Sequence, residues 1–227
     1  YVPEAFPEDV LSYKELSGKS YQEIADVVLS HFFTNFTADE RKAMIASAYN
    51  EETFRDDRIV PLHSIDTDLS VAELFHGRTL AFKDLALSLF PYLLTAAKKQ
   101  EQEKREILIL TATSGDTGKA ALEGFKDVPG TNIMVFYPSE GVSPMQQQQM
   151  QKQEGDNVRV SAIHGNFDDA QSFLKRVFTN PDVNAYANEK GVLFSSANSI
   201  NIGRLVPQVV YYFDAYRQLV EANEVEQ

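Results

Sequence analysis

The sequence predicts an α/β protein, in which a parallel sheet is flanked by helices and preceded by a helical amino-terminal segment. Three features of the 227 residues support this fold class: short apolar runs recur in the second half, helical segments separate these runs, and helix-start signals mark the first part. Strands that alternate with helices form parallel sheets, because each helix carries the chain back across the sheet.

The amino-terminal region, residues 1–58, is predicted to be helical. Residues 20–23 (Ser-Tyr-Gln-Glu) and 37–40 (Thr-Ala-Asp-Glu) match the capping box that opens a helix. Apolar residues follow the first box at helical spacing, and the second helix is expected to reach about Tyr49. The polar stretch 50–57 is predicted to connect this region to the next.

The α/β region is predicted to cover residues 59–200. Residues 143–146 place a cap residue, a first-turn proline and a capping-box glutamine in order, and 167–178 carries an apolar stripe, so both segments are predicted helices. The last region, 201–227, is expected to form a helix containing Pro207 that leads into further sequence. The predicted buried strands are 107–110, 133–136, 158–160 and 192–194.

Charge argues against nucleic acid as a partner. The net charge of −12 is unfavourable for a phosphate backbone, which requires a basic face. A phosphorylated small molecule would have to be held by local donors such as Lys119 and Arg204.

Composition also limits the membrane, disulfide and metal-binding classes to which the protein could belong. The longest apolar run, 85–97, contains Pro91 and fits a core helix better than a membrane span, so no membrane partner is expected. The chain has no cysteine, which excludes disulfides and is compatible with a reducing compartment; we predict the cytoplasm. The four histidines lack metal-ligand spacing, so no metal is expected. The sequence does not indicate the oligomeric state.

Lys83 is the first candidate for chemistry. It follows Phe82 and stands at the start of the strongly apolar run. A lysine held against apolar surface loses stabilisation of its ammonium form, and the neutral amine can hold an aldehyde cofactor as a Schiff base. The alternative is that Lys83, beside Asp84, is a solvated surface charge.

A second candidate is the loop 113–118 (Thr-Ser-Gly-Asp-Thr-Gly), which lies between a predicted strand and a helix. Two glycines would let backbone amides approach a ligand closely, and the amino end of a helix favours an anion. The alternative is a tight strand-to-helix turn without a ligand. A nucleotide-phosphate loop does not fit, because Ala120 stands where a magnesium-binding serine or threonine is needed.

The third candidate, residues 198–204 (Asn-Ser-Ile-Asn-Ile-Gly-Arg), follows the last predicted strand. The guanidinium of Arg204 offers a planar fork for phosphate, and a nearby helix start offers amides. In the alternative interpretation Arg204 is an exposed helix arginine and Ser199 or Asn201 is a cap.

Taken together, these segments resemble the threonine synthase family of enzymes that use pyridoxal 5′-phosphate (PLP), within the fold-type II or tryptophan synthase β-like group. The resemblance covers nearly the whole chain. Arg78, where the family has proline, and Gly203, where it often has alanine, depart from the pattern. The matching segments are 1–4, 73–84, 113–118, 141–144, 165–169 and 198–204.

The resemblance implies roles for particular residues. Lys83 would bind PLP covalently and act as the catalytic base and acid, with Phe82 beside it and Asp116 near the cofactor ring. The substrate-binding residues implied by the family are Ser114, Gly115, Thr117, Asn198, Ser199 and Arg204, the last three at the phosphate of the substrate.

The activity implied is the conversion of O-phospho-L-homoserine and water to L-threonine and phosphate. The alternatives are another fold-type II PLP lyase and a non-catalytic homologue. The family's chains are considerably longer than this one, and their glycine-rich loop for the cofactor phosphate has no counterpart here. We therefore expect a piece of such an enzyme, and do not expect this piece alone to be active or to bind PLP stably.

Overall fold

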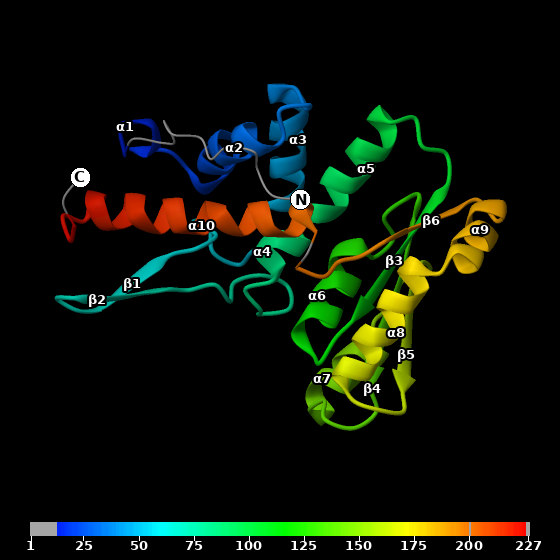
Figure 1. The fold of residues 1–227 in the computed structure, drawn as a ribbon. Coiled ribbons are helices and arrows are strands. Elements are labelled where there is room, and N and C mark those ends of the chain that lie inside the picture. Colours follow the sequence, from blue (N-terminus) through cyan, green and yellow to red (C-terminus); the bar gives the residue numbers. More distant parts are fainter. Residues whose placement is uncertain (1–12, 200, 226–227) are drawn as a thin grey trace. The chain divides into compact units, whose positions relative to one another are not determined.

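The computed structural model describes residues 13–199 and 201–225 (Figure 1). The chain forms two compact units, Tyr1–Leu89 with Ile202–Gln227, and Phe90–Asn201. The first unit is therefore built from two separate stretches of sequence, whereas the second is continuous. The three regions 1–58, 59–200 and 201–227 stay a prediction about domain organisation.

Helices dominate the first unit, as predicted for its amino-terminal part. The Ser20–Glu23 and Thr37–Glu40 capping boxes both form, and the second helix ends at the cap residue Tyr49. In Figure 1, α10 runs between α2 and a β-hairpin, and it packs against both α2 and α4. The helices are α1 (Tyr13–Leu16), α2 (Tyr21–Phe32), α3 (Ala38–Ala48), α4 (Asp84–Leu87) and α10 (Ile202–Glu221).

The hairpin of the first unit was not predicted. Strands β1 (Leu62–Asp66) and β2 (Leu69–Ala72) pair antiparallel. Ser64 and Ser70 donate hydrogen bonds of 2.6 and 2.8 Å to the two carboxylate oxygens of Glu224, just beyond α10. These bonds lower the pKa of Glu224 and tie the hairpin to the end of that helix.

A buried polar network also joins α10 to the segment before β1. The Asp214 carboxylate is buried and accepts hydrogen bonds from Arg217 (3.1 and 2.8 Å) and Gln218 (2.7 Å). Burial raises the pKa of Asp214 despite these partners. Gln218 also donates to the carbonyl of Val60 (2.8 Å) and accepts from the amide of Leu62 (3.1 Å). One side chain therefore satisfies three polar groups.

The second unit contains the predicted parallel sheet, which confirms the α/β fold class. Its strand order is β5-β4-β3-β6, and all neighbouring strands are parallel. The strands are β3 (Glu106–Ala112), β4 (Thr131–Pro138), β5 (Val158–Ile163) and β6 (Val192–Ser195), each overlapping one predicted apolar run. The helices are α5 (Phe90–Gln100), α6 (Asp116–Phe125), α7 (Pro144–Gln151), α8 (Phe167–Thr179) and α9 (Pro181–Glu189).

Helices cover both faces of this sheet. Helix α8 packs on the face that carries Leu110 and Phe136, where the rings of Phe136 and Phe173 lie 5.4 Å apart. Side chains alternate along a strand, so Val135 points to the opposite face. There it lies close to Gly118 of α6, as expected for a helix on that face.

The apolar run 85–97 forms two helices rather than one core helix. Helix α4 ends at Leu87, and α5 begins at Phe90 with Pro91 in its first turn. Proline lacks an amide hydrogen and is favoured in the first turn of a helix, whereas farther along it removes a backbone hydrogen bond. Pro91 therefore marks the start of α5. No helix among residues 13–199 and 201–225 is both long and apolar enough to cross a membrane.

Candidate functional site

Lys83 lies at the amino end of α4, where it occupies the cap position. Its side chain is half-buried, and the Nζ atom lies 5.4 Å from the centroid of the Phe82 ring. Phe82 itself is 40% exposed. The amine is thus held over an aromatic face at an accessible turn.

The aspartate that follows Lys83 is the main brace of this turn. Asp84 is only 4% exposed, so it is not a solvated surface charge. Its carboxylate accepts a 2.7 Å hydrogen bond from the Thr79 amide and a 2.6 Å bond from the Thr79 hydroxyl. A Cβ on Gly77 would meet the Asp84 side chain at 2.5 Å, so glycine is needed there. We call residues 77–85 the lysine turn.

A second contact fixes the lysine turn from outside. The hydroxyl of Tyr49, which is buried, donates a 2.6 Å hydrogen bond to the carbonyl of Leu85. The braces at Asp84 and Tyr49 were not identified from the sequence. The sequence did contain a signal for the Asp84 brace, because Gly77, Thr79 and Asp84 all lie in one stretch that resembles the threonine synthase family.

Arg204 lies in the first turn of α10 and is 4% exposed. It is therefore not the exposed helix arginine of the alternative interpretation. Burial lowers the pKa of its guanidinium. Its role at a phosphate stays a prediction.

In the second unit, residues 113–118 run from the end of β3 into the first turn of α6, between a strand and a helix as predicted, and we call them the glycine loop. The buried Thr113 hydroxyl organises it from within. This oxygen accepts hydrogen bonds from the amides of Gly115 (3.0 Å) and Gly118 (2.9 Å) and donates to the Gly115 carbonyl (3.1 Å). Thr113 was not among the predicted site residues, although it opens the loop.

The structure explains why positions 115 and 118 of the loop are glycine. Gly115 has a φ of 156°, which favours glycine over other residues. A Cβ on Gly118 would come within 2.5 Å of Thr113 and 2.9 Å of Val135, so α6 can approach the sheet only with glycine there. Ser114 and Asp116 are exposed, whereas Thr117 is half-buried.

A glutamine from a different helix reaches the glycine loop. The Nε2 of Gln146, in the first turn of α7, donates a 2.6 Å hydrogen bond to Oδ1 of Asp116. Gln146 was predicted only as part of a capping box. Its contact with Asp116 spans 30 positions, so local sequence patterns gave no sign of it.

Asn198 lies near the base of the glycine loop. Its Nδ2 is 3.5 Å from the carbonyl of Ala112, the last residue of β3, and its Oδ1 accepts from Ser196 at 3.0 Å. Ser199 is exposed. Ligands of parallel α/β sheets bind outside the carboxyl ends of the strands, and the glycine loop and Asn198 both lie at that edge.

The predicted site residues therefore divide between the two units. Lys83, Phe82 and Arg204 belong to the first unit, and the others belong to the second. The predicted role of Lys119 as a local donor to phosphate stays a prediction, and the structure shows this lysine with other partners. Its ammonium bonds to Glu123 at 3.4 Å and to the side chain of Gln153.

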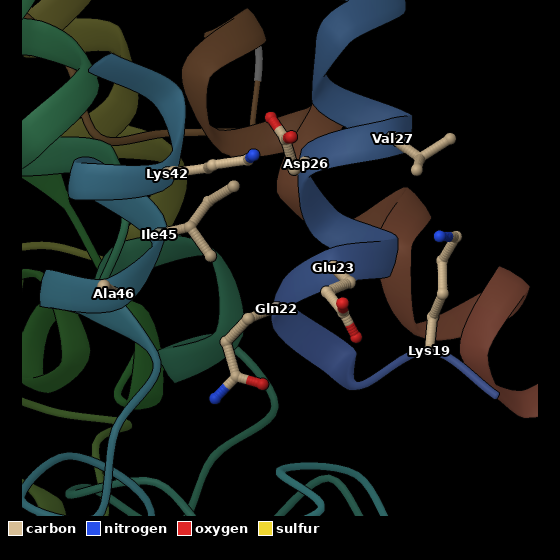
Figure 2. Close-up of a pocket in the computed structure, with 8 residues that line it drawn as sticks. All are labelled: Lys19, Gln22, Glu23, Asp26, Val27, Lys42, Ile45 and Ala46. Atoms are coloured by element: carbon tan, nitrogen blue, oxygen red, sulfur yellow. The ribbon is translucent and has the colours of Figure 1, made fainter. Parts of the chain in front are cut away.

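A pocket between α2 and α3 contains none of the predicted site residues (Figure 2). Its two carboxylates already have partners: Glu23 closes the capping box with Ser20, and Asp26 pairs with Arg41 at 2.9 Å. The pocket therefore offers no organised chemistry. Its lining residues are Lys19, Gln22, Glu23, Asp26, Val27, Lys42, Ile45 and Ala46.

Comparison with known proteins identifies threonine synthases among the relatives, although no family model matches the chain. Threonine synthase of Pseudomonas aeruginosa is 38% identical over 224 residues, which cover 96% of this chain and 45% of that protein. Human threonine synthase-like 1 is 37% identical, over 92% of this chain and 28% of that protein.

Solved structures agree with these relatives. The crystal structure of PLP-bound threonine synthase from Brucella melitensis superimposes with a TM-score of 0.83 and 39% identity, over 96% of this chain and 46% of that one. The chain thus spans about half the length of the relatives it matches. Because sequence and fold agree over nearly all of its residues, the chain belongs to the threonine synthase family.

Proposed function

We propose that the protein of this chain is a PLP-dependent threonine synthase, which converts O-phospho-L-homoserine and water to L-threonine and phosphate. One observation carries the proposal: a braced, accessible lysine, Lys83, on a chain that is 38% identical to a threonine synthase over 96% of its length. The half-length match makes the activity a proposal for the whole protein.

The residues of the two candidate regions suit PLP. Lys83 offers a half-buried amine over the Phe82 ring, to which an aldehyde can be attached. Asp116 offers an exposed, oriented carboxylate at the start of α6. When bound, PLP supplies an electron sink for the bonds at the substrate's amino-bearing carbon.

The anionic groups of the substrate require local donors, because the chain carries a net charge of −12. The hydroxyls of Ser114 and Thr117 are the proposed donors at the amino end of α6, which favours a carboxylate. The amide of Gly115 is held by Thr113, so Gly115 contributes close approach of the backbone to the substrate. Asn198, Ser199 and Arg204 are the proposed phosphate-binding residues. A guanidinium shielded from water binds phosphate more strongly than an exposed one.

Lys83 is also the proposed proton carrier. Lys83 would hold PLP through its Nζ, and when not bonded to the cofactor this amine would accept a proton from one substrate carbon and return it to another. Overall, the C–O bond at the γ carbon breaks and releases phosphate, one hydrogen of the β carbon is transferred as a proton to the γ carbon, which becomes the methyl group, and water gives its hydroxyl to the β carbon and its remaining proton to phosphate. The braces on Asp84 and Leu85 hold the backbone of this lysine while its side chain moves.

The test is phosphate release from O-phosphohomoserine, measured with threonine formation, by the whole protein. Lys83→Ala should lower turnover about 1,000-fold or more, because the amine both binds the cofactor and moves protons. Lys99→Ala, at an exposed lysine of α5, is the control and should have no effect. Turnover that survives in Lys83→Ala would refute the assignment.

A second measurement needs no turnover. After incubation with PLP and borohydride reduction, mass spectrometry should locate a pyridoxyl group on Lys83. Adducts spread over exposed lysines instead would count against a site at Lys83.

Another PLP lyase of the same fold type is a second candidate, and a non-catalytic homologue is a third. Both candidates are retained because the chain is also similar to a protein called threonine synthase-like 1. Activity assays with amine-containing substrates other than O-phosphohomoserine distinguish a threonine synthase from another PLP lyase. Absence of a Lys83 adduct in the whole protein would favour the third. A cytoplasmic location also remains a proposal, for which cell fractionation is the measurement.

A further inference from the structure

The Gln146 side chain does not close its own capping box as its counterparts do. In α2, α3 and α8 the third helical residue is acidic, and its carboxylate accepts from the backbone amide of the cap residue. In α7 the Ser143 side chain accepts from the Gln146 amide, but the Gln146 carboxamide bonds to other groups. Its Oε1 accepts from the Ser143 hydroxyl at 3.1 Å, and its Nε2 donates to Asp116 at 2.6 Å.

This second contact explains glutamine rather than glutamate at position 146. Either residue suits the third position of a helix. Only the carboxamide can donate a hydrogen bond to a carboxylate, whereas glutamate would place a second negative charge at hydrogen-bond distance from Asp116. Glutamine at position 146 is therefore explained by the hydrogen bond that it donates to Asp116 and not by helix capping, for which glutamate would serve as well.

Gly115 makes room for the contact. A Cβ on Gly115 would lie 2.5 to 2.6 Å from the Nε2, Cδ and Oε1 atoms of Gln146. The carboxamide thus lies directly against the backbone of the glycine loop. Any side chain at position 115 would push it away from Asp116.

Helix α7 holds Gln146 firmly in this position. Gln151 donates to the hydroxyl of the buried Tyr137 at 2.7 Å, and Gln147 does so at 3.3 Å. Met150 is fully buried, and its sulfur would be 2.9 Å from a Cβ on Gly118. The helix that carries Gln146 is therefore packed against the glycine loop's own helix.

We propose that Gln146 is a positioning residue, whose carboxamide lies against Gly115, holds the Asp116 carboxylate and so sets how Asp116 meets the bound cofactor. The inference rests on the proposed function. Gln146 itself takes no part in the reaction; it acts through Asp116.

The test compares Gln146→Met and Gln146→Glu in the whole protein loaded with PLP. Methionine keeps the length but donates no hydrogen bond, and kcat should fall about 10-fold. Glutamate adds repulsion, and kcat should fall about 100-fold, with a shift in the absorbance spectrum of bound PLP. Gln148→Glu makes the same charge change at an exposed site of the same helix and should leave both unchanged.

A double variant separates positioning from a general effect on folding. In Asp116→Asn, the new amide can donate to the carboxylate introduced by Gln146→Glu, which restores the hydrogen bond in the opposite direction. Gln146→Glu should therefore weaken PLP binding strongly in the wild-type background and by less than about 2-fold in the Asp116→Asn background. Equal losses in the two backgrounds, or wild-type spectra and kcat in both single variants, would overturn the inference.

The measurement also distinguishes this inference from the proposed function. A protein that binds PLP but releases no phosphate from O-phosphohomoserine would refute the proposed function. In that case, PLP binding by the single and double variants at positions 116 and 146 would still decide the role of Gln146. A whole protein that binds no PLP would overturn both.

Discussion

The lysine turn and the glycine loop are both short connectors that lead into a helix, yet they are fixed by different means. The lysine turn is closed by a buried charge, the Asp84 carboxylate, which bonds twice to Thr79 five positions earlier. The glycine loop is closed by a neutral hydroxyl, Thr113, and its exposed Asp116 depends on Gln146 from another helix. Apart from the bond of Tyr49 to Leu85, the lysine turn is closed by its own residues, whereas the carboxylate of Asp116 in the glycine loop is held by Gln146, 30 positions away.

This difference predicts that substitutions in the lysine turn and in the glycine loop have different effects. A buried carboxylate that loses its donors is costly, so changes in the lysine turn should appear mainly as lost stability. A displaced glutamine at a half-exposed site costs less stability but reorients Asp116. Changes around the glycine loop should therefore affect activity more than unfolding.

The largest loss of stability is expected for Gly77→Ala. The new methyl group would overlap the Asp84 side chain, which its hydrogen bonds hold in place, so the free energy of unfolding should fall by about 3 kcal/mol. Gly18→Ala is the control: its φ is +71° but no atom lies within 4 Å, so only backbone strain of about 1 kcal/mol is expected. Equal losses in urea unfolding would contradict the role given to Asp84.

Gly115→Ala tests the glycine loop in the same way. Its cost should be about 2 kcal/mol, from backbone strain and from displacement of the Gln146 carboxamide. Adding Gln146→Ala should return part of this loss, because the displaced group is gone. If the double variant is less stable than Gly115→Ala, then the clash is not with Gln146.

A double-mutant cycle on Thr79→Val and Asp84→Asn measures the lysine-turn brace itself. The coupling between the two positions in the free energy of unfolding should be about 1.5 kcal/mol. Ser47→Ala, whose hydroxyl bonds within α3, should combine additively with Asp84→Asn. Additivity of the Thr79 and Asp84 changes would show that their bonds do not hold the turn.

The smallest effect is expected at Lys119, which follows the glycine loop directly. Lys119→Met removes a partly exposed ion pair, so stability should change by only about 0.5 kcal/mol. The KM for O-phosphohomoserine should be unchanged, because Glu123 and Gln153 hold this ammonium. A large rise in KM would place Lys119 at the substrate and extend the glycine loop by one residue.

Elements with local signals could be predicted from the sequence. The two predicted capping boxes of the amino-terminal region form, and the strands of the parallel sheet coincide with apolar runs. The hairpin escaped prediction because most of its side chains are exposed, so β1 and β2 lack the buried face that gives a strand its pattern.

The candidate site was less accessible to sequence reasoning. Lys83 and the glycine loop were found because they stand in stretches that resemble a family. The burial of Asp84 was not found, since an aspartate at a helix start is usually solvated. The contact of Gln146 with Asp116 depends on how α7 packs beside α6, which no local pattern encodes.

The hydrogen bonds between Glu224 and the hairpin affect the order in which the chain can fold during synthesis. The first unit is closed by late residues: Glu224 holds Ser64 and Ser70, Gln218 holds Val60, and Glu221 accepts from the amide of Gly18. A ribosome releases these partners only after all of residues 90–201 have emerged. The sheet of the second unit can therefore assemble first, while the first unit, which bears Lys83, is completed only after α10 and Glu224 have been synthesised.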